Sequence, residues 1–167
     1  MPNDGPQERL DVAELVPGIR NGVRAVILKD DHLLLLRKVY EDGSDRYVLP
    51  GGSQDAGETL AEALQRECRE EIDTEVTISG MLYLADYFKQ RDTTPVSYRQ
   101  QVEFFFLCSV SADYQARNGY RPDRHQESVV WVALGRLEAM NLFPRELCGL
   151  LATGKPETYP VYLGKIR

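Results

Sequence analysis

The stretch from Leu49 to Val76, LPGGSQDAGETLAEALQRECREEIDTEV, decides how the rest of the chain is interpreted. It begins with a glycine-rich turn that contains Gly51 and Gly52 and continues into a segment with helical periodicity. Glycine lets the backbone turn tightly and approach a ligand closely. The free N–H groups at the start of a helix favour an anion. The stretch therefore predicts a turn followed by a helix, a combination suited to binding phosphate.

The helical segment is predicted to run from Thr59 to Ile72, because apolar residues recur along it at helical spacing. These residues form one stripe, namely Ala61, Leu64, Cys68 and Ile72. We expect the stripe to face the interior and the opposite face of the helix to carry the charged side chains.

Three glutamates, Glu67, Glu70 and Glu71, stand at positions i, i+3 and i+4 of this helix and are therefore neighbours on its surface. Exposed like charges at this spacing repel each other by roughly a few tenths of a kcal/mol per pair. A cation among them would relieve that repulsion, and carboxylate oxygens are ligands that Mg²⁺ and Mn²⁺ prefer. The alternative is a solvated helix in which Arg66 and Arg69 neutralise the glutamates.

Length and charge limit the class of protein. The chain has 167 residues, of which 43% are hydrophobic, enough for one domain with a substantial core. We predict a single domain over residues 18–167 after a loose N-terminal leader over residues 1–17. The net charge of −6 argues against a nucleic-acid-binding protein, which normally has a basic surface. The apolar runs are too short to span a bilayer, so no membrane association is expected.

The three cysteines are Cys68, Cys108 and Cys148, which lie far apart among apolar neighbours. This odd number and spacing predict buried free thiols rather than disulfides or a CxxC metal site. Free thiols are typical of a reducing compartment, so a cytoplasmic location is expected.

The runs that flank the central stretch predict an α/β protein. Residues 22–28 and 32–40 form a predicted antiparallel hairpin with its turn at residues 29–31. In the second strand Leu33 and Leu35 point one way and Leu34 and Leu36 the other, so both faces of the sheet should be covered. This indicates a layered α/β/α arrangement. The remaining predicted elements are strands at residues 75–88, 98–110 and 128–134, a helical turn at 136–140, an amphipathic helix at 144–151 and a terminal strand or tail at 159–166.

A long polar loop, residues 111–126, separates two predicted strands. Loops of this length in compact domains are often lids or binding loops. Its arginines, Arg121 among them, are candidates for binding phosphate, and Arg37 in the second strand is a further candidate for substrate specificity. The alternative interpretation of the loop is a solvated insertion.

The central stretch resembles the Nudix box, Gly-x5-Glu-x7-Arg-Glu-U-x-Glu-Glu-x-Gly-U, in which U is an aliphatic residue. The glycine and all charged positions of that pattern are present at the correct spacing, namely Gly52, Glu58, Arg66, Glu67, Glu70 and Glu71. Three other positions depart from it: Cys68 and Thr74 replace aliphatic residues, and Asp73 replaces the glycine that ends the helix. Asp is among the few residues tolerated in the left-handed conformation expected there.

This resemblance implies a Nudix fold, an α/β/α sandwich with a mixed β-sheet, over about residues 22–151. It also implies a Mg²⁺-dependent pyrophosphohydrolase, with Mn²⁺ as a substitute metal. The substrate would be a nucleoside diphosphate linked to another moiety, such as an NDP-sugar or a dinucleotide. Glu67, Glu70 and Glu71 would hold the metal, and Glu58 would pair with Arg66 to brace the loop and helix. Gly51 and Gly52 would lie against the substrate, and a homodimer is compatible with the family.

Two questions stay open at this level. The general base would lie either in the box, with Glu70 as the candidate, or just ahead of a late strand, where Glu127 stands; an isolated Glu at a strand start is also typical of plain surface. The competing functional class is a non-catalytic nucleotide sensor that keeps the fold and binds without cleaving. No residue pattern outside the box identifies the base or the leaving group.

Overall fold

The computed structural model describes residues 11–152 and 161–167. Its nine-stranded mixed sheet has the order β8-β3-β2-β1-β6-β5-β9, with β4 paired to β1 and β7 paired to β2. The strands are β1 (Arg20–Lys29), β2 (His32–Val39), β3 (Asp45–Val48), β4 (Gly51–Ser53), β5 (Thr77–Arg91), β6 (Ser97–Ser109), β7 (Gln126–Ala133), β8 (Leu142–Phe143) and β9 (Val161–Lys165).

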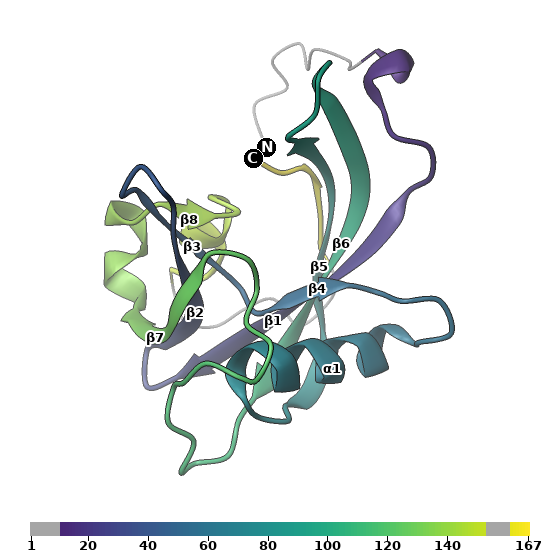
Figure 1. Cartoon of the computed structure of the whole chain (residues 1–167). Coiled ribbons are helices and arrows are strands. Elements are labelled where there is room, and N and C mark those ends of the chain that lie inside the picture. The colour runs from purple at the N-terminus through teal and green to yellow at the C-terminus, as the bar shows by residue number, and fades with distance from the viewer. Residues whose placement is uncertain (1–10, 153–160) are drawn as a thin grey trace.

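Strand β1 joins two halves of this sheet. It pairs in parallel with β6 along residues 20–27 and antiparallel with β4 at residues 22–24. With β2 it shares only the two pairs next to the turn, Leu28 with Leu33 and Lys29 with His32. The two halves therefore diverge from β1, with β5, β6 and β9 on one side and β2, β3, β7 and β8 on the other (Figure 1).

Both faces of the sheet are covered, as the alternation in β2 predicts. Leu34 and Leu36 pack in a core cluster with helix α1 (Leu60–Ile72). Leu33 and Leu35 pack in a second cluster with the 3₁₀ helix η2 (Leu134–Ala139) and the short helix α2 (Leu147–Leu150). The predicted α/β class with a mixed sheet is confirmed. The second helical layer is slight, because α2 has only four residues in place of the eight predicted.

Helix α1 is fixed at both ends. The Thr59 side chain accepts a hydrogen bond from the Glu62 N–H, and the Glu62 carboxylate accepts one from the Thr59 N–H, which together form a capping box. At the other end Asp73 adopts the left-handed conformation, with φ of 55°. The motif Thr-x-x-Glu was visible in the sequence and marks the start of the helix.

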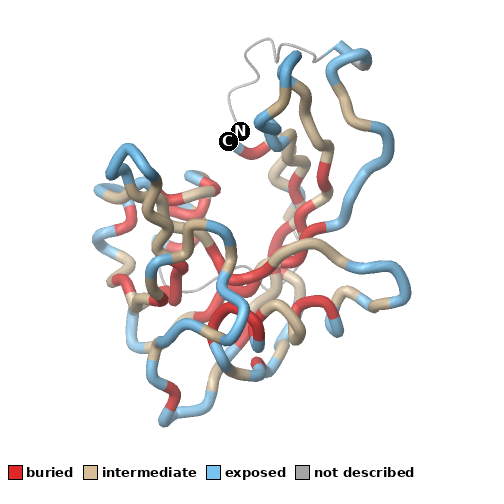
Figure 2. Tube along the Cα trace, in the orientation of Figure 1, coloured by how far each residue is buried: buried red, intermediate tan, exposed pale blue. Residues whose placement is uncertain are grey.

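The predicted orientation of α1 was wrong in one respect. Ala61 is exposed, whereas Ala63 is buried, and so are Glu70 and Glu71. At 100° per residue the buried face is centred near Glu71, and Ala61 lies at its edge. The carboxylates therefore face the molecule and not the solvent, and Figure 2 shows buried segments along this helix. This orientation contradicts the solvated helix of the alternative interpretation, although Arg66 does pair with Glu67 and Glu70 as that interpretation expects.

Other predictions hold within the described residues. The loop between β6 and β7 has no regular secondary structure, and all three cysteines are free and buried. The predicted leader falls largely on residues 1–10, which lie outside the described part; residues 12–14 form a 3₁₀ turn, and Leu15 bridges to Tyr98. None of the described helices is both long and apolar enough to cross a membrane.

Candidate functional site

The glycine-rich turn brings the backbone against β1. Gly51 has φ of +138°, and a Cβ there would lie 2.9 Å from the carbonyl carbon of Val23, so only glycine fits. At Gly52 a Cβ would lie 2.5 Å from the carboxyl carbon of Glu67. The two glycines thus leave room for a strand on one side and for a carboxylate of α1 on the other.

Glu71 is the most deeply buried of the three glutamates, with 3% of its surface exposed. Its Oε2 accepts a hydrogen bond of 2.8 Å from the Gly51 N–H. Burial raises the pKa of Glu71 to about 8, because few groups replace the lost water. A positively charged group bound beside the Glu71 carboxylate would therefore stabilise its charged form.

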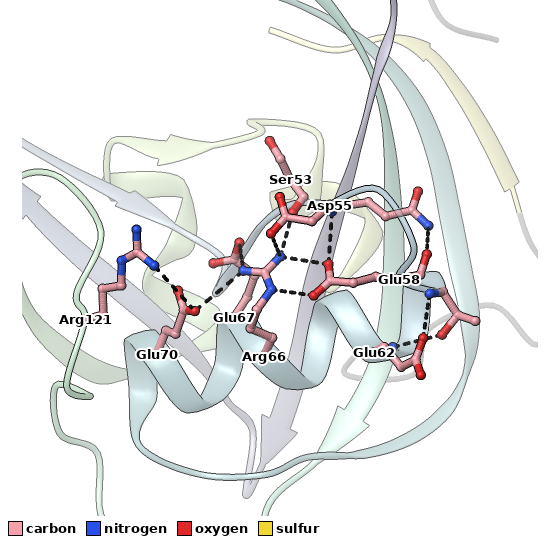
Figure 3. A network of polar contacts seen from close by, with 10 residues as sticks. Ser53, Asp55, Glu58, Glu62, Arg66, Glu67, Glu70 and Arg121 are labelled. Atoms are coloured by element: carbon pink, nitrogen blue, oxygen red, sulfur yellow. Dashed lines mark hydrogen bonds and ion pairs between the residues drawn. The ribbon is translucent and has the colours of Figure 1, made fainter.

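Glu67 and Glu70 lie beside Arg66, as Figure 3 shows. Arg66 Nη1 lies 2.9 Å from Glu67 Oε1 and 3.7 Å from Glu70 Oε1, and its Nε lies 2.6 Å from Glu58 Oε1. Arg66 also donates to the Ser53 carbonyl at 2.9 Å. One guanidinium therefore joins the glycine loop, Glu58 and two carboxylates of α1.

Glu58→Gln tests this brace through its pH dependence. Hydrogen bonding by Arg66 holds the pKa of Glu58 at about 2, against an ordinary value of 4.5. A carboxylate with a lowered folded-state pKa contributes stability above pH of about 4.5 and loses it as the pH falls towards 2. We expect the variant to have a lower Tm than the wild type at pH 6 and a difference that vanishes towards pH 2. Thermal melts from pH 2 to pH 6 measure this difference in Tm, with Glu41→Gln, at an exposed position, as the control. A difference in Tm that does not change with pH would contradict the brace.

The box residues fit a divalent metal ion. Their carboxylate oxygens are hard donors of the kind that Mg²⁺ and Mn²⁺ prefer, and the missing side chain of Gly52 leaves a cradle beside Glu67. Burial also raises the pKa of Glu67, although Arg66 opposes the shift. Within residues 11–152 and 161–167, no three acidic, histidine or cysteine side chains converge closely enough to hold a metal as they stand. Glu71 instead turns to Gly51, while Glu67 and Glu70 turn to Arg66.

The 110–125 segment is a cap on the end of α1 rather than a free insertion. The Gly119 N–H donates to the Glu71 carbonyl at 3.0 Å, and the Arg121 N–H donates to the Glu70 carbonyl at 2.9 Å. The hydroxyl of the buried Tyr114 donates to the Ile72 carbonyl at 2.8 Å. Three of the last four carbonyls of the helix, which have no partner within it, are satisfied in this way.

Gly119→Ala is expected to loosen this cap. A Cβ at Gly119 would lie 2.6 Å from the Glu70 carbonyl carbon and 2.7 Å from the Arg69 oxygen, so the loop must move away from the helix. Because buried carbonyls would lose their donors, we expect unfolding free energy to fall by about 2 kcal/mol. Urea unfolding measures the change, and Gly135→Ala is the matched control, since a Cβ there meets nothing within 4 Å. Equal midpoints for the two variants would contradict the cap.

A cavity of about 130 Å³ lies between the two halves of the sheet, next to the glycine turn. One water needs roughly 10–15 Å³, so the cavity has room for a larger chemical group. Among the described residues, its walls carry four cations, Arg24, Lys38, Arg46 and Lys89, and four aromatic rings, Tyr40, Tyr87, Phe105 and Phe143. Two acidic residues, Glu103 and Asp123, also line it and pair with Arg24 and Lys38 respectively. Positive charge combined with aromatic surface suits a nucleotide.

The three candidate residues outside the box lie in different places in the structure. Arg121 lies beside the box, with its Nη1 3.9 Å from Glu70 Oε1, and its side chain is exposed. Arg37 pairs with Asp45 at 3.3 Å and is not among the described residues that line the cavity. Glu127 is exposed at a bulge in β7, between the residues that pair with Lys38 and Arg37.

Sequence reasoning missed the residues that line the cavity. Arg24 on β1, Lys38 on β2 and Glu103 on β6 come from three strands distant in the sequence. Only one local signal was available: a charged residue within an otherwise apolar strand, as in Gly22–Leu28 and Gln101–Cys108. Such a residue is buried and paired or serves a site.

Comparison with solved structures supports the fold. A MutT NUDIX hydrolase from Burkholderia pseudomallei is 28% identical, with a TM-score of 0.54 over 71% of this chain and 85% of that one. An ADP-ribose pyrophosphatase from Streptococcus suis is 19% identical, with a TM-score of 0.59 over 87% and 98%. A UDP-X diphosphatase is 20% identical, with a TM-score of 0.59 over 87% and 68%. The search of curated proteins found no match.

The model of the NUDIX domain family matches residues 18–148, which is well over half of the chain. The match contains the glycine turn, helix α1 and the late strand β7. It agrees with the predicted enzyme class, a Nudix-type pyrophosphohydrolase, and with the hydrolases and pyrophosphatases among the structural neighbours. The chain therefore belongs to the NUDIX domain family.

Proposed function

We propose that the protein hydrolyses a pyrophosphate bond in a nucleoside diphosphate linked to another moiety, with Mg²⁺ as cofactor and Mn²⁺ as a substitute. The observation that carries the proposal is the burial of Glu70 and Glu71, beside Glu67, on a helix that contacts a glycine turn at the border of a cationic, aromatic cavity. Nudix domains generally depend on a divalent metal. The three glutamates would hold it, and it would supply positive charge to the pyrophosphate oxygens.

The chain's own residues supply the other parts of the reaction. The cations of the cavity, Arg24 and Lys38 among them, would bind phosphate oxygens, and the aromatic rings would contact the base or the linked moiety. Arg121 would contribute charge at the open side of the box, and Gly51 and Gly52 would let the substrate approach the backbone. Water would attack one phosphorus of the pyrophosphate, and Glu70 or Glu127 would accept its proton. The bond from that phosphorus to the bridging oxygen would break, which releases a nucleoside monophosphate and the phosphate of the linked moiety.

A substrate panel tests this function. The protein is incubated with Mg²⁺ and NDP-sugars, dinucleotides and nucleoside triphosphates, and release of nucleoside monophosphate is measured by chromatography. ADP-ribose and UDP-sugars belong in the panel because two structural neighbours are named for such substrates. We expect metal-dependent release from at least one class. Absence of turnover from every compound, with tight binding of a nucleotide by calorimetry, would instead favour the sensor.

The net charge and the cysteines support expectations about the partner and the cellular location. The substrate is a small molecule, and the acidic net charge of −6 supports neither nucleic acid nor an anionic membrane as a partner. The three buried free thiols support a cytoplasmic location.

A further inference from the structure

A series of polar contacts connects the wall of the cavity to helix α1. Arg24 Nε donates to Glu103 Oε2 at 3.0 Å, and Arg24 Nη1 donates to the Gly51 carbonyl at 2.9 Å. The N–H of the same glycine donates to Glu71 Oε2 at 2.8 Å. One residue of the turn therefore touches both the arginine of the cavity and the innermost carboxylate of the box. The strands involved, β1, β4 and β6, meet at the centre of the fold (Figure 1).

Glu103, the first residue in this series of polar contacts, is buried. Only 1% of its surface is exposed, and it lies opposite Gly22 in the parallel pair of β1 and β6. A Cβ at Gly22 would lie 2.7 Å from the carboxyl carbon of Glu103, so the space for this side chain depends on a glycine. The carboxylate also holds Arg24 at a second point, with Nη2 3.4 Å from Oε1.

Stability alone does not explain a carboxylate at this position. Desolvation of a buried ion pair often cancels its attraction, and apolar residues of similar size are frequently as stabilising. The next position on the same face of β6 carries such a residue, because Phe105 is buried there. The Glu103 carboxylate fixes the orientation of the Arg24 guanidinium. An apolar residue at position 103 would not.

Arg24 keeps donors for a ligand. A guanidinium has five N–H groups, and three contacts engage it, two with Glu103 and one with Gly51. Arg24 also lines the cavity, with 23% of its side chain exposed. Its planar fork matches two phosphate oxygens when its orientation is fixed.

We propose that Glu103 is a positioning residue: it orients Arg24 towards the pyrophosphate and, through Gly51, keeps Glu71 aligned with that group. This inference rests on the proposed function, because it assigns a role within the same reaction. Glu103 contacts Arg24 and acts through it. Arg24 contacts the carbonyl of Gly51 and Glu71 contacts its N–H, so a displacement of the guanidinium that moves Gly51 also moves the support of the carboxylate.

The experiment compares the wild type with Glu103→Gln, Arg24→Gln and the double variant on the best substrate of the panel. Gln keeps the shape of Glu but loses the charge, and misplacement of a positioned group can cost about 10²-fold. We expect Glu103→Gln to lower kcat by about 10- to 100-fold with less than about a threefold change in KM. If Glu103 acts through Arg24, the double variant will be no slower than Arg24→Gln alone.

Two further measurements separate positioning from folding. Mn²⁺ titration by calorimetry without substrate is expected to show several-fold weaker binding in Glu103→Gln, because Glu71 loses a fixed support. Arg24→Lys keeps the charge and lacks the fork, so it is expected to lower kcat although Glu103 is still paired. Glu138→Gln removes the carboxylate of an exposed pair with Arg145, 2.9 Å apart, and serves as the control with wild-type kinetics.

The outcomes are distinguishable. A wild type without turnover on any substrate contradicts the proposed function itself. An active wild type with full kcat in Glu103→Gln, or with multiplicative losses in the double variant, overturns the role of Glu103. Unchanged Mn²⁺ affinity overturns the link to Glu71. If Glu103→Gln does not fold, full activity in Arg24→Lys overturns the inference.

Discussion

Replacing Glu71 with Gln is expected to lower kcat by about 10³-fold. The loss corresponds to roughly 4 kcal/mol of transition-state stabilisation, a magnitude typical of charge supplied by a bound metal. Gln retains an oxygen that can accept the Gly51 N–H, so the turn and the fold should persist. The rate of nucleoside monophosphate release with saturating Mg²⁺, together with circular dichroism, measures both expectations. Glu70→Gln is expected to have a loss of similar size.

The matched control is Glu75→Gln, which makes the same change just beyond α1. Glu75 is exposed and pairs with Arg69 at 3.2 Å, away from the glycine turn. It should turn over substrate at the wild-type rate. Full activity in both Glu70→Gln and Glu71→Gln would remove the metal-binding role of the box and the proposed function with it.

Gly51→Ala is expected to have the largest effect on stability, a loss of about 3 kcal/mol or more. A φ of +138° is strained for any L side chain, and the added methyl would press on the Val23 carbonyl of the adjacent strand. Relief of that contact must separate β4 from β1, which also displaces the Gly51 N–H from Glu71. Denaturant unfolding with the free energy extrapolated to water measures the loss, and activity should fall in parallel.

Gly80→Ala is the corresponding control on β5, because a Cβ there meets nothing within 4 Å and the backbone needs no positive φ. Its unfolding free energy should stay within about 0.5 kcal/mol of the wild type. If Gly51→Ala were equally well tolerated, the close approach of the turn to β1 would not hold in solution.

Local sequence features predicted much of the fold. The run of four leucines in β2 predicted a sheet covered on both faces, and each face has its own core cluster. The Lys29-Asp30-Asp31 turn predicted the hairpin, and Asp30 and Asp31 both adopt the positive φ that a tight hairpin turn requires. These features were predictable because they depend on the period of the side chains and on the conformations that single residues allow.

The orientation of α1 was not predictable from its apolar stripe. Ala61 fitted the stripe but is exposed, and Glu70 and Glu71 are buried although charged residues usually face water. The buried Glu71 accepts a hydrogen bond from Gly51 of the glycine turn, and Glu70 lies near the guanidinium groups of Arg66 and Arg121. A hydrophobic pattern contains no information about such partners when they lie on another element.

The sequence by itself determined the family, the charged residues of the box and the glycine turn, because these lie within 23 consecutive residues of fixed spacing. The tertiary structure alone decided what surrounds them. It brought Arg24, Glu103 and Gly51 into contact from three strands, turned the late loop into a cap on α1, and left Arg37 outside the cavity. The physical reason is that these contacts join side chains and backbone groups of different elements, such as Arg24 and Glu103, which are 79 positions apart in the chain.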